Sequence, residues 1–490
     1  MKYIDEPKIN AILAQAKTAS TGDINAVLDK SRALKRLSLQ ETAVLLAARK
    51  PADIKKIFAT ALSVKNTIYG QRVVMFAPLY ISNVCSNRCL YCAFNAGNHV
   101  MPRRRLTIEE IKKETAHLLA RGHKRVLVVA AESAASDEVG YYVDAVKAVY
   151  AARSGRHYIR RVNINCAPLS VPEFRRLKAS GIGTYQIFQE TYHSATYRKV
   201  HLSGPKSDPD NRITAPDRAF RARLDDVGIG VLYGLYDWRF ETLAMLSHVE
   251  HLERVFGVGP HTISVPRVEP AQGSAFSRTP PYPVSDADFK KIVAVLRLSV
   301  PYTGLILSTR ERPSLRDQLF RLGISQISAA SSTVPGGYAA ASDPDTVAGQ
   351  FAVCDHRSLD QVMYSLIKKG MVPSFCTACY RSKRTGERFM RLAKPGAIKG
   401  MCDMNSLITL REYLDDFATS RTRKAGFALI AQAKGKLGGA RQKKLEAFFS
   451  HIAAGRRDEY VCYLPWIKHL NLTACISLYS AAPTWESPAS

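Results

Sequence analysis

Short apolar runs alternate with amphipathic segments between residue 72 and about residue 330. The runs predict strands, and the segments between them, such as 107–121 and 286–299, carry apolar residues at helical spacing. The candidate strands are 72–82, 125–131, 159–165, 184–188, 228–236, 262–267, 304–309 and 326–329. Eight β/α steps predict an α/β fold, a TIM-type (β/α)8 barrel whose reactive site lies on the loops after the strands.

The pattern changes on both sides of this barrel. Residues 1–70 predict an N-terminal helical region, in which Ser38 and Glu41 form a capping box. We expect the barrel over 71–340, a helical C-terminal domain with a second cysteine group over 341–460, and an irregular tail over 461–490. No apolar run is long enough to span a bilayer, and the N-terminus lacks a secretory apolar segment, so we expect a cytoplasmic protein without membrane contact.

Charge and cysteine content narrow the class of protein. The formal net charge is +28, from 70 basic and 42 acidic residues, which invites nucleic-acid binding. The charge is spread widely, however, and no aromatic-interleaved or helix-turn-helix motif accompanies it, so a solvated basic surface is expected instead. Six of the ten cysteines fall in two tight groups, which predicts metal binding in a reducing compartment and no disulfide framework.

The first cysteine group directly follows the first predicted strand. Cys85, Cys89 and Cys92 have the spacing C-x3-C-x2-C, with Tyr91 just before the third cysteine. A 4Fe-4S cluster normally takes four thiolates, so three leave one iron open, and S-adenosylmethionine (SAM) can bind there. The alternative is a structural zinc knuckle, which needs a fourth ligand; His99, the nearest candidate, lies in an ordinary loop. The spacing resembles that of the radical-SAM superfamily.

The second group lies in the C-terminal domain. Cys376 and Cys379 are followed after 22 residues by Cys402. Taken alone, this pattern is also typical of half a zinc site. In a chain that already carries the first motif, it predicts a second 4Fe-4S cluster with an open iron.

Both cysteine motifs and several surrounding segments identify a family. The segments are FQETYH at 188–193, SGPK at 203–206, DDVG at 225–228, GVGPHTISVPR at 257–267 and TGERFM at 385–390. Over residues 35–460 the chain resembles the radical-SAM tyrosine lyases of the HydG family, which mature the FeFe hydrogenase. The related 2-iminoacetate synthases, tyrosine lyases of thiazole synthesis, lack the C-terminal motif.

The resemblance implies a reaction at two sites. At the first cluster L-tyrosine is cleaved at Cα–Cβ to p-cresol and dehydroglycine. At the second cluster dehydroglycine yields carbon monoxide and cyanide, which bind an additional dangling iron, held with a free cysteine, as an Fe(CO)2(CN) synthon. Reduced ferredoxin or flavodoxin as electron donor and the other hydrogenase maturases are the implied protein partners.

Polar residues at predicted strand ends are the candidates for binding SAM and tyrosine. For SAM we expect Tyr91, Glu132, Asn163, Asn165 and Glu190; for tyrosine we expect Arg310, Ser308, Gln189 and Arg161. Arg310 is favoured for the substrate carboxylate, against an ion pair with Glu311 or Asp237. For the dangling iron the family implies a histidine; His251 is favoured over His261.

Three other functions remain open at this point. A lyase of the 2-iminoacetate synthase type would stop at dehydroglycine. A radical-SAM enzyme that modifies RNA would explain the positive charge. A cluster carrier or scaffold would bind the metal without consuming SAM.

Overall fold

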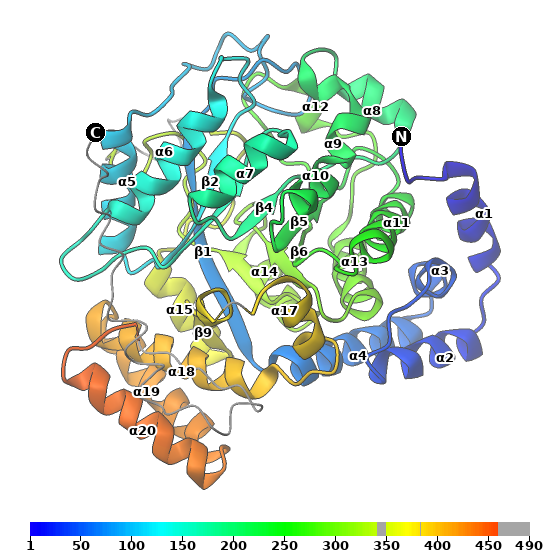
Figure 1. The fold of residues 1–490 in the computed structure, drawn as a ribbon. Helices are drawn as coiled ribbons and strands as arrows, with labels where there is room; N and C mark the ends of the chain where they lie inside the picture. Colours follow the sequence, from blue (N-terminus) through cyan, green and yellow to red (C-terminus); the bar gives the residue numbers. More distant parts are fainter. Residues whose placement is uncertain (341–348, 383, 459–490) are drawn as a thin grey trace.

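The computed structural model describes residues 1–340, 349–382 and 384–458 of the 490-residue chain. Its centre is a closed barrel of parallel strands, in which β1 pairs with both β2 and β8 (Figure 1). The strands are β1 (Arg72–Ser82), β2 (Arg125–Ala130), β3 (Arg161–Asn165), β4 (Thr184–Gln186), β5 (Asp226–Gly230), β6 (Thr262–Ser264), β7 (Gly304–Leu307) and β8 (Gln326–Ser328). The predicted TIM-type barrel is confirmed, and the tail predicted for 461–490 lies outside the described residues.

Helices surround the barrel and follow its strands in the order that a β/α repeat requires. The longer ones are α5 (Ile108–Ala120), α6 (Glu138–Ala151), α7 (Val171–Ala179), α10 (Ala215–Arg221), α11 (Trp238–Phe256), α13 (Asp286–Ser299) and α14 (Pro313–Leu319). Short segments lie in the loops: α8 (Ser194–Val200), η1 (Pro205–Ser207), α9 (Pro209–Ile213) and α12 (Ala275–Arg278). Helix starts are capped by local side chains; Thr107 caps α5 and Ser170 caps α7.

The N-terminal residues form a helical layer over the side of the barrel that α11 and α13 occupy (Figure 1, blue). It consists of α1 (Glu6–Ala16), α2 (Thr21–Arg32), α3 (Leu39–Ala47) and α4 (Pro51–Tyr69). The capping box of Ser38 and Glu41 is present at the start of α3. Because this layer covers α13, that helix is buried on nearly every side, and the buried ammonium of Lys291 donates to the carbonyl oxygen of Leu46 at 3.1 Å.

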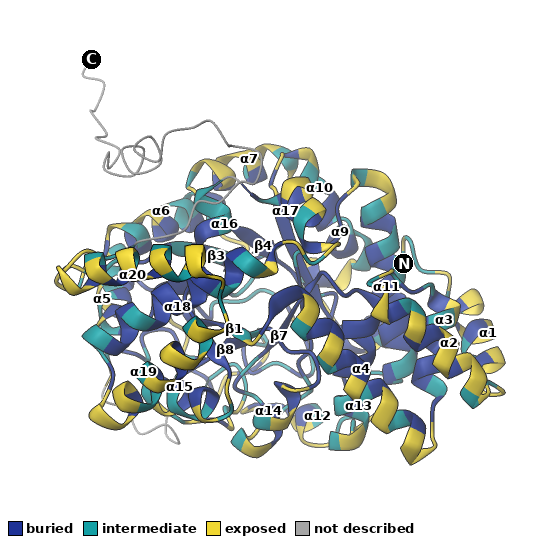
Figure 2. Ribbon diagram, turned by 90° about the horizontal axis from the view of Figure 1, so that it is seen from below, coloured by how far each residue is buried: buried dark blue, intermediate teal, exposed yellow. Residues whose placement is uncertain are grey.

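The C-terminal residues cover the end of the barrel where the strands begin. Their elements are α15 (Leu359–Lys368), β9 (Val372–Ser374), α16 (Ala378–Arg381), α17 (Gly386–Ala393), α18 (Lys399–Asp416), α19 (Ser420–Gly435) and α20 (Gly439–Ala453). The short strand β9, which the apolar pattern did not predict, pairs with the first residues of β1. Helix α18 is mostly buried, with α19 and α20 outside it (Figure 2). The second cysteine group is thereby held against the barrel.

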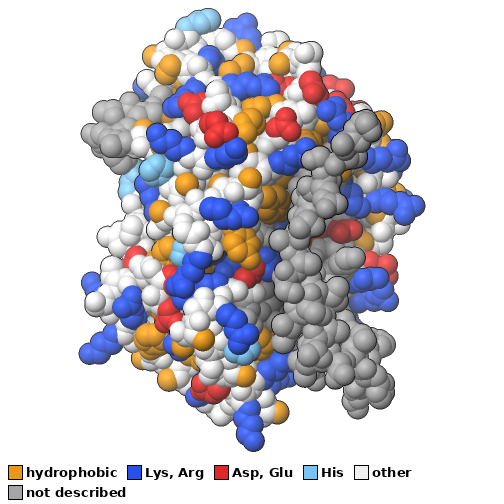
Figure 3. All heavy atoms as spheres, turned by 60° about the vertical axis from the view of Figure 1, so that its left-hand side comes forward, with side chains coloured by type: hydrophobic (Ala, Val, Ile, Leu, Met, Phe, Trp, Pro, Cys, Tyr) orange, Lys and Arg blue, Asp and Glu red, His pale blue; other side chains and the backbone are white. Residues whose placement is uncertain are grey.

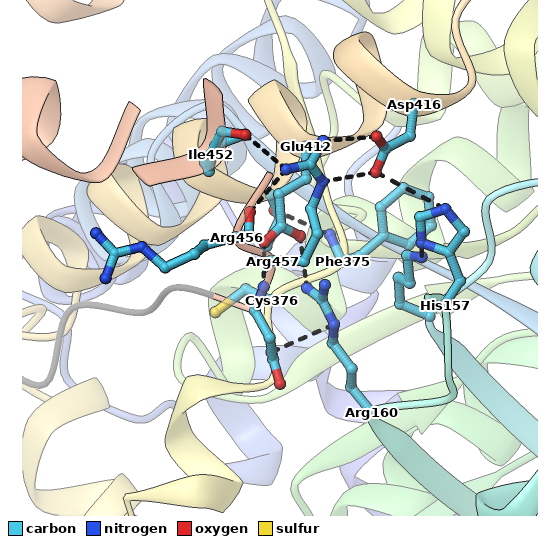
Figure 4. Close-up of polar contacts among 12 residues, drawn as sticks. His157, Arg160, Phe375, Cys376, Glu412, Asp416, Ile452, Arg456 and Arg457 are labelled. Atoms are coloured by element: carbon cyan, nitrogen blue, oxygen red, sulfur yellow. Dashed lines mark hydrogen bonds and ion pairs between the residues drawn. The ribbon is translucent and has the colours of Figure 1, made fainter. Parts of the chain in front are cut away.

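Buried ion pairs also join the barrel to these helices (Figure 4). Arg160, just before β3, places its Nη1 2.6 Å from Oε2 of Glu412 on α18. Arg457, after α20, lies 2.6 Å from Asp416 at the end of the same helix. Each buried charge therefore has a partner of opposite sign, as burial requires.

The surface reflects the positive charge of the sequence. Lys and Arg side chains are scattered over the face shown in Figure 3, with Asp and Glu among them. Among the described residues, no helix is long and apolar enough to cross a membrane.

Candidate active site and metal centres

Two cavities lie at opposite ends of the barrel, and the same strands line both of them. Side chains of a strand alternate between its two faces, so every second residue of β1 faces the interior. Arg72 and Val74 of β1 line the cavity near the strand starts, whereas Phe76 and Tyr80 line the cavity near the strand ends. The two cavities are thus separated by the side chains that fill the middle of the barrel.

The first cavity contains the first cysteine group. Cys85, Cys89 and Cys92 all line it, in the loop directly after β1. Backbone N–H groups of Ser86 and Leu90 donate to the carbonyl oxygens of Glu132 and Val200, at 2.9 and 3.0 Å. These bonds hold the loop over the strand ends, which is where a TIM-type barrel places its reactive site.

The thiols of this loop fit a cluster better than a single ion. Burial raises the pKa of Cys89 to about 12 and that of Cys92 to about 11, so a cation must be present for both to ionise at neutral pH. The described residues contain no group of three or more Cys, His, Asp or Glu close enough to hold one metal ion. A 4Fe-4S cluster distributes its thiolates over separate irons, so three spaced cysteines around one cavity suit it.

Two carboxylates of the first cavity have basic partners. Glu132 accepts from the amide of Asn87 at 3.0 Å and lies 3.4 Å from Arg212. Glu190, whose backbone is left-handed with φ of 70°, accepts from the ammonium of Lys206 at 2.6 Å. Both carboxylates face the cavity with their charge already balanced in part.

Arg310 and Ser308, after β7, also line the first cavity, as do Asn165 and Tyr91. The guanidinium of Arg310 lies 3.3 Å from the ring centre of Phe351, and burial lowers its pKa. Glu311, the proposed competitor, instead accepts from Nε of Arg267 at 3.0 Å. Among the described residues Arg310 has no carboxylate partner, so it is available to a ligand.

Three predicted site residues lie elsewhere, and their assignments are corrected. Arg161 is the first residue of β3, not its end, and lies at the opposite end of the barrel, 3.5 Å from the ring centre of Tyr380. Asn163 is in mid-strand and accepts from the backbone of Thr184 at 3.0 Å. Gln189 points away from the cavity and donates to the carbonyl of Pro209 at 3.2 Å.

Two residues of the first cavity were missed by the sequence analysis, Lys206 and Arg212. Lys206 lies in the SGPK segment, so the family resemblance marked its position but not its role. Arg212 lies on the short helix α9, far in sequence from any strand end, and no local pattern singles it out. Their ion pairs with Glu190 and Glu132 exist only in the folded chain.

The second cavity contains the second cysteine group. Cys376 follows β9, Cys379 lies on α16 and Cys402 lies on α18, and all three line the cavity. The guanidinium of Arg125, the first residue of β2, donates to the carbonyl of Cys376 at 2.6 Å and fixes this segment to the barrel. Burial raises the pKa of Cys379 to about 12, so these thiols also need a cation to ionise.

The two candidate histidines have different surroundings. His261, just before β6, lines the second cavity, and its Nδ1 lies 3.6 Å from Asp226. His251 lies outside this cavity: its ring stacks on Tyr3 with 3.5 Å between ring centres, and its Nε2 is 2.8 Å from Asp217. His251 is thus not among the residues that line the second cavity, because its face of α11 turns toward the N-terminus and α10.

Comparison with known proteins agrees with this geometry. Residues 79–246 match the family model of the radical SAM superfamily, and residues 264–372 match that of the Biotin and Thiamin Synthesis associated domain. The fold and the three-cysteine loop after β1 define a radical SAM enzyme.

Similar proteins give a closer assignment. A crystal structure of HydG, a maturase of the [FeFe]-hydrogenase, is 45% identical, with a TM-score of 0.90 over 94% of this chain and 100% of that one. HydG from Carboxydothermus hydrogenoformans is 40% identical, with a TM-score of 0.79 over 90% of this chain and 97% of that one. The 2-iminoacetate synthase of Escherichia coli is 32% identical over 73% of this chain and 90% of its own length. The chain belongs to the family of radical SAM lyases that contains these proteins.

Proposed function

We propose that this chain cleaves L-tyrosine to p-cresol and dehydroglycine, and converts dehydroglycine to carbon monoxide and cyanide for an Fe(CO)2(CN) synthon of FeFe-hydrogenase maturation. One observation carries the proposal. A single barrel has a cavity with three cysteines at each end, and residues of the same strands line both. Similarity to HydG extends over nearly the whole chain.

In the first cavity, a 4Fe-4S cluster and SAM would be held by Cys85, Cys89 and Cys92, and when bound they supply a carbon radical that abstracts hydrogen. Glu132, Asn165, Glu190 and Tyr91 line the same cavity and would contact SAM. Arg310 would bind the tyrosine carboxylate in a bidentate manner, with Ser308 beside it. Its guanidinium is suited to this because no carboxylate of the described chain occupies it.

In the second cavity, Cys376, Cys379 and Cys402 would hold a second 4Fe-4S cluster. The cargo iron, with a free cysteine, would be bound by His261. The carboxylate of Asp226 faces Nδ1 of this ring, which leaves Nε2 for the metal, an arrangement that histidine ligands commonly show.

The barrel interior between the cavities suits the passage of a small polar fragment. The amide of Gln186 and the hydroxyl of Thr262 lie inside it, 3.5 Å apart. Gly228 packs closely against this pair, since a Cβ at this position would come within 2.5 Å of Oγ1 of Thr262. Dehydroglycine would reach the second site without entering bulk water, where its imine hydrolyses.

A lyase of the 2-iminoacetate synthase type is the second candidate. Its similarity to this chain is lower in identity and in coverage than that of HydG. The buried second cysteine group has no function under that hypothesis, which favours the first proposal. On the face shown in Figure 3 the basic side chains are scattered among acidic ones and form no stripe, which disfavours RNA modification.

We further propose that reduced ferredoxin or flavodoxin supplies the electron, that the other hydrogenase maturases are partners, and that the protein works in the cytoplasm. The net charge of +28 supports attraction to acidic electron-transfer proteins.

An anaerobic assay tests the reaction. Reconstituted protein is incubated with SAM, dithionite and L-tyrosine, and p-cresol, carbon monoxide and cyanide are measured together. We expect all three products, and loss of the two diatomic products with retention of p-cresol in a Cys376→Ala/Cys379→Ala variant. Formation of p-cresol alone by the unmodified protein would establish the second candidate instead, and intact tyrosine would reject both.

A further inference from the structure

Arg72, the first residue of β1, lies in the second cavity together with all three cysteines of that site. A guanidinium keeps its positive charge in proteins, so this cavity contains a fixed cation beside the three thiols.

This cation has no hydrogen-bond or ion-pair partner among the described residues. Its Nε is buried without a partner. Other buried guanidinium groups nearby differ in this respect: Arg125 donates to the carbonyl of Cys376, and Arg297 donates to the carbonyl oxygens of Gly323, Pro301 and Thr303. Arg72 as a whole is half-buried, and its guanidinium also lies 5.5 Å from the ring centre of Tyr69. A guanidinium that faces an enclosed cavity without a hydrogen-bond acceptor indicates a ligand that the chain does not itself supply.

A second unpartnered group lies next to Arg72. Gln326, the first residue of β8, pairs in register with Val74 of β1 and lines the same cavity. Its amide has no hydrogen-bond partner among the described residues, and Gly304 makes room for it, since a Cβ there would come within 2.5 Å of Nε2. Asp403 of α18 forms its ion pair with Lys399, at 3.8 Å. Two donors thus face the cavity with no acceptor.

We propose that Arg72, assisted by Gln326, binds the carboxylate of a small α-imino or α-amino acid beside the second cysteine group. A planar guanidinium binds a carboxylate through two parallel hydrogen bonds, and an enclosed cavity strengthens them. The inference rests on the proposed function, which brings such carboxylates to this cavity from two sources. One source is the dehydroglycine fragment made in the first cavity, and the other is the free cysteine that accompanies the cargo iron.

Whether dehydroglycine is the ligand of Arg72 can be tested by measuring the products that it forms. Dehydroglycine that is not retained reacts with one water at its C=N bond and leaves as glyoxylate and ammonium. In an Arg72→Gln variant we expect p-cresol to be formed as before, at least a tenfold loss of carbon monoxide and cyanide, and a matching gain of glyoxylate. Arg72→Lys keeps the positive charge but not the two parallel N–H donors of arginine. We expect its yields of carbon monoxide and cyanide to lie between those of the unmodified protein and those of Arg72→Gln.

Whether free cysteine is the ligand of Arg72 can be tested by measuring binding in the absence of turnover. The fully reconstituted holoenzyme, reduced and without SAM or tyrosine, is titrated with L-cysteine and separately with glyoxylate as a stable stand-in for the fragment. The EPR signal of the second cluster reports each complex. We expect the half-saturating concentration of one or both probes to rise at least tenfold in Arg72→Gln, and the affected probe identifies the source.

Control variants separate this role from folding and from charge alone. Arg391→Gln removes one exposed cation of α17 outside the cavity and is expected to change neither readout. Should Arg72→Gln fail to retain iron, Gln326→Met removes the second donor without removing a charge. Unchanged affinity for both probes together with unchanged glyoxylate release would overturn the proposal and leave Arg72 as a counter-charge to the thiolates. If the unmodified protein releases its whole fragment as glyoxylate, the proposed diatomic synthesis fails, and the titrations alone decide the role of Arg72.

Discussion

Lys206 and Glu190 form a buried ion pair, 2.6 Å between Nζ and Oε1, in the wall of the first cavity. The two residues come from different loops at the carboxyl ends of the strands, η1 and the segment after β4. Their contact joins these loops across the site in which the first cysteine group lies.

The ion pair predicts an asymmetric mutational effect. Lys206→Met leaves a buried, unpaired carboxylate, and we expect it to lower the free energy of unfolding by about 3 kcal/mol. The double variant Lys206→Met/Glu190→Gln removes that charge and is expected to be more stable than the single one. Urea unfolding of the two variants measures this. Lys199→Met, at an exposed position of α8, is the control, with a change below about 0.5 kcal/mol. Additive effects in the double variant would contradict the prediction.

The histidine assignment predicts that two similar substitutions differ in outcome. His261→Ala is expected to reduce cargo iron and synthon yield by about 10- to 100-fold or more, because it removes a metal ligand. His251→Ala disrupts a contact with Asp217 and is expected to lower thermal stability while the yield per folded protein stays unchanged. Iron content per chain and cyanide release, measured on both variants, test the assignment. A loss of iron in His251→Ala alone would reverse it.

Glu241 predicts a dependence of stability on pH. This residue of α11 is fully buried, and burial raises the pKa of its carboxyl to about 8, although hydrogen bonds from Thr191 and Tyr192 oppose the shift. The folded state therefore keeps a proton that the unfolded state loses near pH 4, so stability falls as the pH rises from about 4 to about 8. One such group contributes a slope of at most about 1.4 kcal/mol per pH unit. Unfolding measured between pH 5.5 and 8.5 should show a shallower slope in Glu241→Gln, and an unchanged slope would exclude this carboxyl as the cause.

Substitution of two neighbouring acidic residues at the end of α18 is expected to change stability by different amounts. The buried carboxylate of Asp416 lies 2.6 Å from both Arg156 and Arg457, and its contact with Arg457 is drawn in Figure 4. Asp415 pairs with Arg411 on the same helix at 2.9 Å. Asp416→Ala is expected to cost about 3 kcal/mol and to expose the C-terminal helices to protease. Asp415→Ala is the matched control, with a change of less than about 0.5 kcal/mol. Equal protease sensitivity of the two variants would show that the ion pairs do not hold this region.

The barrel strands and the cysteine motifs could be predicted from the sequence. The apolar run at 72–82 predicted β1 with the bounds that the structure has, and all eight barrel strands were located, some with ends a few residues too long. The first cysteine motif was found by its spacing, because a short loop brings its thiols together whatever the rest of the chain does. The second was interpreted from the presence of the first, since 22 residues separate Cys379 from Cys402, which lies on another helix. Local sequence is sufficient for such features, since strand alternation and loop spacing are local properties.

The positions of polar site residues in the folded protein could not be predicted in the same way. His251 and His261 lie ten positions apart, and the sequence analysis favoured His251. The rotation of α11 turns His251 toward Tyr3, while the start of β6 directs His261 into the second cavity. Arg161 was assigned to the wrong end of the barrel, because a strand of five residues spans about 17 Å and its two ends serve different sites.

The sequence by itself determined the class of fold, the two cysteine groups and the family. Only the tertiary structure decided which polar side chains meet in each cavity, and it did so for Arg72, Lys206 and Arg212 as well as for the histidines. The physical reason is that a buried charge is defined by its partners. Those partners come from segments far apart in the chain, and no periodicity in the sequence records the distance between them.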